Sequence, residues 1–309
     1  MDLELDPAER QKRKERQERD QDNFIRDEIL DNAEVICAQM ITAGGDFLFR
    51  QLGSFDAILV DEVAQCTEIN TIVPIVQRGC SRLVLSGDHC QLPPTVQSEE
   101  AEERGMSVSL YARLVREGLE AKFLDTQFRS HPKLMEFSSK MVYDGRLKDG
   151  IRGEERPALQ GFVWPRRDVP VAFVDMGRGY HEQQQGESKA NPKEVEKLLQ
   201  VLIMVLRKKN LRPRDVGVVT PYMAQVRLLK RSWHSLCARE NLDQAEAREL
   251  EIASVDNFQG REKELILFSA VRSNQRGMVG FLRDWRRLNV MLTRARRGLI
   301  VFGSSHTLR

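Results

Sequence analysis

The stretch Ala57-Ile58-Leu59-Val60-Asp61-Glu62-Val63-Ala64-Gln65 decides the fold that we expect for this chain. Its first four residues form a continuous apolar run, which is typical of a strand buried on both faces of a parallel sheet. Two acidic residues follow at once, at the position where open α/β sheets bind their ligands. Comparable apolar runs recur along the chain, at Leu83–Leu85, Val171–Val174, Val216–Val219, Leu265–Phe268 and Leu299–Phe302.

Helical patterns lie between these runs, at Val108–Glu117, Pro192–Lys209 and Met223–Ala238. The second pattern has a well-marked start, because Asn191 can cap the helix and Pro192 suits its first position. Strands that alternate with helices predict an α/β fold. We place a domain boundary near residue 123.

Three other segments carry weaker patterns. Residues 6–31 predict a long charged helix with Asp6 as N-cap, either as a solvated helix or as one arm of a stalk that packs beside a larger domain. Residues 144–190 predict loops around one strand, since they show little periodicity. Glu99–Glu103 predicts an acidic loop to which we assign no chemistry.

Composition sets the broad class of the protein. The chain has 309 residues, of which 41% are hydrophobic and 30% charged, as in globular proteins. A net charge of +2 neither demands nor excludes a nucleic-acid partner, but six arginines between Arg283 and Arg297 suit a phosphate-rich ligand. No apolar run reaches the length of a membrane span, and the N-terminus does not resemble a signal peptide. Five scattered cysteines favour a reducing compartment, so we expect a cytoplasmic protein, with the nucleus as the other option.

Adjacent carboxylates after a buried strand suit nucleotide hydrolysis. Asp61 can hold Mg²⁺ through its water shell, and Glu62 can orient or deprotonate the attacking water. The alternative is a helix N-terminus that carries acids because the helix dipole favours them. The two residues alone do not decide between these interpretations.

Five short stretches of the sequence form a set. They are Asp61–Gln65, Gly87–Pro94, Gln127–Pro132, Ser254–Lys263 and Arg287–Arg296. They resemble motifs II, III, IV, V and VI of superfamily 1 helicases, in that family's order, and the nearest match is the regulator-of-nonsense-transcripts branch, the helicases of nonsense-mediated mRNA decay. The resemblance covers nearly everything from Val35 to Gly303.

The resemblance implies a domain organisation. Such helicases have two RecA-like domains, each a parallel sheet flanked by helices, with ATP and Mg²⁺ in the cleft between them. Residues 31–123 would be the C-terminal part of the first domain, with motifs II and III, and residues 124–309 the complete second domain, with motifs IV, V and VI. Residues 1–30 would be the remnant of a charged helical stalk.

The resemblance also assigns catalytic roles beside Asp61 and Glu62. Gln91 would read the γ-phosphate, since an amide both donates and accepts hydrogen bonds. Arg129 and Arg294 resemble the two arginine fingers, which bridge phosphate oxygens and spread charge in the transition state. For Arg294 the alternative is a structural ion pair.

The same resemblance implies a binding site for the nucleotide. Phe128, where the family more often has Tyr, would stack on the adenine. Gly260 would permit close backbone approach, and Glu262 would accept a hydrogen bond from the ribose or a nearby donor. The other nucleotide-binding positions are Gln65, Gly87 and Asp88.

Relatives of this kind act on RNA, DNA or both, so the expected partner is a single strand of either. Thr42, Thr220 and Tyr222 resemble the family's nucleic-acid contacts, which are made mainly to sugar and phosphate. Thr42 and Tyr222 could equally be turn and packing residues. The resemblance further suggests mRNA-decay factors as protein partners, and no membrane.

One family motif has no counterpart here. The phosphate-binding loop G-x-x-G-x-G-K-[ST] cradles the phosphates with backbone amides and a lysine, whereas this sequence has no Gly-Lys dipeptide. We therefore expect one of two things. The chain is either a fragment of an ATP-dependent helicase, which would hydrolyse nucleoside triphosphates and move 5′ to 3′, or a non-catalytic nucleic-acid-binding or regulatory remnant of such a helicase. A fragment is the interpretation that we favour, because the other motifs are in good order.

Overall fold

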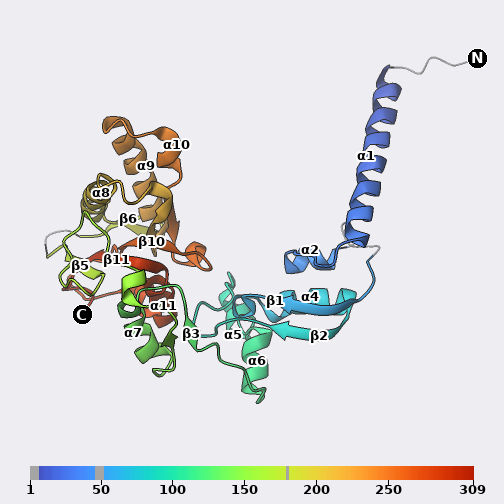
Figure 1. Ribbon diagram of the computed structural model, residues 1–309, viewed down its shortest axis with the longest axis horizontal. Coiled ribbons are helices and arrows are strands. Elements are labelled where there is room, and N and C mark those ends of the chain that lie inside the picture. Colours follow the sequence, from blue (N-terminus) through green and yellow to red (C-terminus); the bar gives the residue numbers. More distant parts are fainter. Residues whose placement is uncertain (1–6, 46–51, 179–180) are drawn as a thin grey trace, which may run out of the picture. The chain divides into compact units, whose positions relative to one another are not determined.

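A computed structural model describes residues 7–45, 52–178 and 181–309 of the chain (Figure 1). Their contacts divide the chain into two compact units. The first unit holds residues 1–89 and 93–120, and the second holds residues 90–92 and 121–309. Asp6, the expected N-cap of the first helix, lies outside the described residues.

The first unit is built on two parallel strands. Strand β1 (Phe55–Val60) pairs with β2 (Cys80–Leu85), as a strand-helix-strand connection requires. The chain reaches β2 through a short 3-10 turn and helix α4, which begins where the Thr67 side chain accepts a hydrogen bond from Asn70 N at 3.3 Å. The helices of this unit are α1 (Pro7–Asp31), α2 (Met40–Gly44), α4 (Glu68–Arg78), α5 (Glu99–Glu103) and α6 (Leu110–Arg116).

Two expectations for this unit were wrong. Strands β1 and β2 are not buried on both faces, since Leu59 is 73% and Val84 50% exposed. An apolar run indicates that its residues prefer burial, but the strand is buried only where neighbouring elements pack on both of its faces. The acidic segment 99–103 is helix α5 rather than a loop, because Ser98 caps it through Ala101 N at 3.3 Å and acids suit the first turn of a helix.

The second unit is built on a five-stranded parallel sheet in the order β5-β11-β10-β8-β9. This sheet, flanked by helices, confirms the predicted α/β fold with a parallel sheet. Its strands are β5 (Val171–Asp175), β8 (Val216–Thr220), β9 (Glu251–Ser254), β10 (Lys263–Ser269) and β11 (Ala295–Gly303). The helices of the unit are α7 (Pro132–Val142), α8 (Pro192–Leu206), α9 (Met223–Arg239), α10 (Gln244–Arg248) and α11 (Trp285–Leu292).

Helix α8 begins as the sequence predicted. The Asn191 side chain accepts a hydrogen bond from Glu194 N at 3.2 Å, and Pro192 opens the first turn. Buried aliphatic side chains of α8, such as Leu198 and Leu202, join those of the central strands in one core. The helix ends at Leu206, three residues before the predicted end.

The segment 144–190 holds more strands than expected. We predicted one strand, but its described residues form four: β4 (Lys148–Asp149), β5, β6 (Gln183–Gln185) and β7 (Ser188–Ala190). Strand β4 pairs with β3 (Thr126–Gln127), and β6 forms a hairpin with β7. Strands this short leave no periodic pattern for sequence analysis to detect. Within the described ranges, no helix is both long and apolar enough to cross a membrane.

Candidate nucleotide-binding residues in the two units

The acidic pair follows β1 in the first unit, as predicted. Glu62 adopts a left-handed backbone conformation (φ 51°, ψ 34°), which is uncommon outside glycine and is often found at functional sites. Its N–H donates to the Asp61 carboxylate at 3.0 Å. The Gln65 amide donates to the Glu62 carboxylate at 2.7 Å, so it fixes the direction in which that carboxylate points.

Motifs II and III lie side by side at the carboxyl ends of β1 and β2. Val63 N donates to Ser86 O at 2.9 Å, and Ser86 N donates to Val60 O at 2.8 Å. A Cβ atom at Gly87 would lie 2.9 Å from Ala64 N, so only glycine permits this close approach. The structure thereby brings Asp61, Glu62, Gln65, Gly87 and Asp88 to one end of the two-stranded sheet.

Gln91 belongs to the second unit, where it meets Arg294. The Arg294 guanidinium donates to Gln91 Oε1 at 3.2 Å. It also donates to Val290 O at 2.9 Å and to Thr293 Oγ1 at 2.9 Å, and the residue is only 2% exposed. These bonds hold the guanidinium in one orientation, and they join the stretches that resemble motifs III and VI, which are about 200 residues apart in the sequence.

Phe128 and Arg129 line a cavity of about 420 Å³ within the second unit. The Phe128 ring is 64% exposed, so much of it can receive a planar ligand. The ring packs against Gly150, where a Cβ atom would overlap it. Glu262 closes part of the cavity and pairs with the Arg129 guanidinium. The remaining lining residues are Gln127, Ser130, Met135 and Arg296.

Contacts with motif VI hold the loop that carries Phe128 and Arg129. Ser130 Oγ donates to Ala295 O at 2.7 Å, and the Arg129 guanidinium donates to Thr293 O at 3.1 Å. Arg156 donates to Arg129 O at 3.0 Å. Sequence reasoning missed Gly150 and Arg156, because each lies in the segment without clear periodicity, and only the tertiary contacts show what they do.

Arg296 is a further residue that sequence reasoning did not single out. Its guanidinium lies 3.7 Å from the Glu262 carboxylate and 3.3 Å from the Glu264 carboxylate. It stands two positions after Arg294 in the stretch that resembles motif VI. Its place in that stretch was the available signal.

The sheet of the second unit separates two groups of predicted residues. Its strands are all parallel, so they share one amino edge and one carboxyl edge. Glu262 and Arg294 directly precede β10 and β11 and therefore lie at the amino edge. Thr220 ends β8 at the carboxyl edge, with Tyr222 two residues beyond.

Thr220 and Tyr222 are buried. Thr220 is 0% exposed, and its Oγ1 has no hydrogen-bond partner among the described residues. Tyr222 is 3% exposed, and its hydroxyl accepts a hydrogen bond from Arg272 at 3.2 Å. In this conformation neither side chain faces an external ligand. Thr42, in contrast, is exposed on α2, in the first unit.

A buried polar network lies at the same carboxyl edge. The Glu194 carboxylate accepts hydrogen bonds from Ser269 Oγ at 2.6 Å and from Val271 N at 2.8 Å. Val271 has a φ of 68°, which is strained for a β-branched residue. Burial raises the pKa of Glu194 to about 7, because desolvation disfavours the charged carboxylate.

Comparisons with known proteins show which sequences are similar to this chain. Two family models, each described as an AAA domain, match residues 3–99 and 106–306. The regulator of nonsense transcripts 1 homolog of Drosophila melanogaster is 40% identical over 282 residues, which cover 91% of this chain and 23% of that protein. The ATP-dependent helicase NAM7 of Saccharomyces cerevisiae is 37% identical over 283 residues, which cover 91% of this chain and 28% of that protein.

This chain thus spans about a quarter of the length of these relatives. Among solved structures, the nsp10 helicase of PRRSV matches over 79% of this chain and 35% of its own, with 14% identity and a TM-score of 0.25. The model that matches residues 106–306 alone covers more than half of the chain. The chain therefore belongs to the AAA-domain family, and its sequence is similar to the regulators of nonsense transcripts.

Proposed function

We propose that this chain is part of an ATP-dependent helicase that moves along single-stranded RNA or DNA. The observation that carries the proposal is the cavity of the second unit, where an exposed aromatic ring, an arginine and a carboxylate converge within about 420 Å³. A nucleoside triphosphate has a planar base, a ribose with hydroxyl donors and a polyanionic tail, and each part has a matching group there.

The acidic pair of the first unit supports the hydrolytic part of the proposal. Oxygen ligands suit Mg²⁺, and Asp61 is exposed at a strand end, so its carboxylate would hold the ion through the ion's water shell. Bound Mg²⁺ would neutralise charge on the phosphates. Glu62 would orient or deprotonate the attacking water, and the 2.7 Å hydrogen bond from Gln65 would position its carboxylate.

Two arginines would serve the transition state in different ways. Arg294 is already oriented by three acceptors, one of which is the Gln91 amide. Arg129 is paired with Glu262, so phosphate oxygens would have to compete with that carboxylate for its guanidinium. When ribose hydroxyls donate hydrogen bonds to the Glu262 carboxylate, as we propose, the Arg129 guanidinium is released from its ion pair. It then becomes available to the phosphates. Nucleotide binding would thereby prepare the arginine for its role.

The nucleic-acid contacts belong to the same proposal. Thr42 is exposed and can contact a sugar or phosphate directly. Thr220 and Tyr222 are buried, so their contribution would require rearrangement at the carboxyl edge of the sheet. By similarity to the regulators of nonsense transcripts, mRNA-decay factors are the protein partners that we propose, in the cytoplasm or the nucleus.

Non-catalytic binding of nucleic acid is the second candidate function. One specific observation favours it: the sequence has no Gly-Lys dipeptide, and the lysine of a phosphate-binding loop supplies positive charge beside the β- and γ-phosphates. A chain with this sequence could bind nucleotide and nucleic acid and yet hydrolyse nothing.

Binding of a fluorescent ATP analogue to the purified chain tests the proposed site. We expect Phe128→Ala to weaken binding about 5- to 150-fold, since base stacking contributes about 1–3 kcal/mol. Phe137→Ala is the matched control, because Phe137 is also exposed, at 52%, but does not line the cavity. Equal loss of affinity in both variants, or in neither, would remove the cavity from nucleotide binding.

A further inference from the structure

Strands β5 and β9 are the two edges of the sheet of the second unit. Among the residues that the structure describes, β9 pairs with β8 only. Val255 N donates to Thr220 O at 3.2 Å, so its backbone faces β8. Because orientation alternates along a strand, Ile252 and Ser254 direct their N–H and C=O groups away from β8. An edge of this kind is a template for a further strand.

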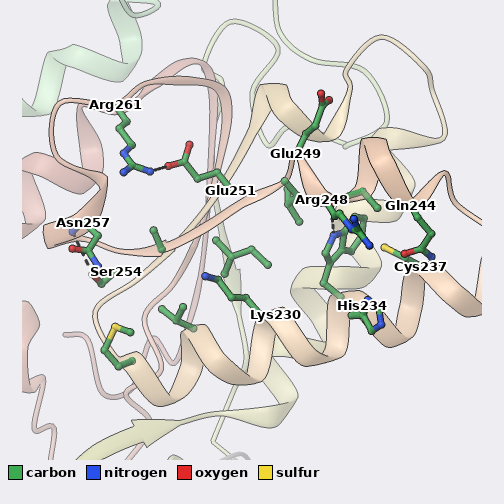
Figure 2. Close-up of a pocket in the computed structure, with 17 residues that line it drawn as sticks. Lys230, His234, Cys237, Gln244, Arg248, Glu249, Glu251, Ser254, Asn257 and Arg261 are labelled. Carbon is green, nitrogen blue, oxygen red and sulfur yellow. Dashed lines mark hydrogen bonds and ion pairs between the residues drawn. The ribbon is translucent and has the colours of Figure 1, made fainter. Parts of the chain in front are cut away.

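A groove of about 700 Å³ runs beside this edge (Figure 2). Figure 2 shows Lys230 and His234 along α9, with Glu251 and Ser254 along the neighbouring strand. Apolar residues contribute to the lining, among them Val226, Ala247, Leu250 and Ile252, of which each is at most 8% exposed. The groove therefore offers backbone hydrogen-bonding groups on one side and a small apolar surface against which alternate side chains of a bound segment can pack.

The charged residues of the groove favour an acidic occupant. Lys230 and Arg248 line it, and no ion pair joins either to an acid among the residues that the structure describes. The acid Glu251 is already neutralised, since it pairs with Arg261 and lies 3.2 Å from Lys263 Nζ. Glu249 is the other acid of the lining. Positive charge is thus in excess where an approaching side chain would meet it.

We propose that the β9 groove docks an extended peptide segment of alternating acidic and apolar residues, which adds to the sheet as a sixth strand. A peptide fits better than a nucleic acid. Single-stranded nucleic acids bind to exposed aromatic platforms, whereas Trp233 is 6% exposed and its indole N–H donates to Ala247 O at 2.9 Å. The proposal is independent of nucleotide hydrolysis, because no residue of the groove lines the nucleotide cavity.

Selection from a random short-peptide display library on the immobilised chain tests the proposal. We expect alternating acidic and apolar sequences to be enriched. In the double variant Lys230→Glu with Arg248→Glu, the selected peptide should bind about tenfold more weakly or worse. Arg227→Glu is the matched control, because Arg227 is exposed on the same helix but does not line the groove, and this variant should keep the affinity.

Amide hydrogen exchange gives a second, independent measurement. The bound peptide should protect the amides of Ile252 and Ser254, which point to the open edge, while protection elsewhere in the sheet stays the same. Absence of enrichment, enrichment that does not depend on charge, or unchanged exchange at these two amides would overturn the proposal. A labelled oligouridylate is the last arm: if the double variant weakens its binding instead, the groove contacts nucleic acid and the proposal fails.

Discussion

The buried side chain of Glu194 is hydrogen-bonded to a strained backbone segment, so its protonation should affect the stability of the fold. It is 0% exposed, and its carboxylate holds the N–H of the strained Val271 at 2.8 Å. The next residue, Arg272, contacts the hydroxyl of Tyr222 at 3.2 Å. A carboxylate inside the protein thus organises the turn that carries Arg272, at the edge where we expected nucleic-acid contacts.

The first prediction concerns the pH dependence of stability. Because burial raises the pKa of Glu194 to about 7, the folded chain should keep this proton up to about pH 7, whereas the unfolded chain should release it near pH 4.5. The contribution of protonated Glu194 to the free energy of unfolding is therefore fully present below pH 4.5. It is lost as the pH rises through 7, by about 3 kcal/mol at most. Urea unfolding at several pH values should show this decline in the parent chain and a flatter profile in Glu194→Gln.

The second prediction concerns the wall behind Phe128. A Cβ atom at Gly150 would overlap the aromatic ring, so Gly150→Ala should displace the ring and weaken the binding of a fluorescent ATP analogue several-fold. Gly145→Ala provides a comparison from the same segment. It adds the same methyl group where nothing lies within 4 Å of the new Cβ. Because the φ of Gly145 is 70°, this control costs backbone strain but should leave nucleotide affinity unchanged. Undiminished affinity in Gly150→Ala would mean that the ring position does not matter.

At the scale of elements, the same type of apolar run has different surroundings in the two units. Val218 in β8 is 0% exposed because β10 and β9 flank it and helices cover the sheet. Leu59 in β1 is 73% exposed. Both runs read alike in the sequence, so the burial of a strand is a property of its neighbours and not of its residues alone.

A pair of matched substitutions tests this difference. Val218→Thr keeps the shape but buries a hydroxyl, so it should lower the free energy of unfolding of the second unit by about 1–3 kcal/mol. Leu59→Thr, at an exposed position, should change stability by no more than about 0.5 kcal/mol. Urea denaturation followed by far-UV circular dichroism measures both. Similar losses in the two variants would show that Leu59 is covered in solution.

At the scale of the whole molecule, the residues that we propose as catalytic belong to both units, and the sequence contains no Gly-Lys dipeptide of the kind found in phosphate-binding loops. Asp61 and Glu62 would face a polyanion, and like charges repel. A transition-state arginine alone is worth about 10³-fold or more in rate, and the cradle of amides and lysine should be worth at least as much. The ATP hydrolysis that we propose would therefore depend on phosphate-binding groups outside the motifs that we identified.

The whole-molecule prediction is that the purified chain hydrolyses ATP only at background, with or without single-stranded RNA. It should still bind single-stranded nucleic acid weakly, with strong dependence on salt, because phosphate contacts release counterions. A steady-state ATPase assay measures the first point, with Arg294→Ala as control. Robust turnover that disappears in that variant would show that the chain supplies its own phosphate cradle.

The sequence by itself determined the α/β fold, the order of the motifs and the start of α8. These features can be predicted locally, because burial preference, capping and helix periodicity depend on residues that are close together in the sequence. It also placed Asp61, Glu62, Phe128 and Arg129 among the candidate site residues, because motif spacing is a property of the chain.

Only the tertiary structure decided which of these groups meet. It joined Gln91 to Arg294 across about 200 residues, paired Arg129 with Glu262, and buried Thr220 and Tyr222. Such contacts depend on strand order and register, and no local pattern encodes which strands become neighbours. For the same physical reason the sequence could not reveal the open edge at β9, because a strand becomes an edge only when the sheet around it is complete.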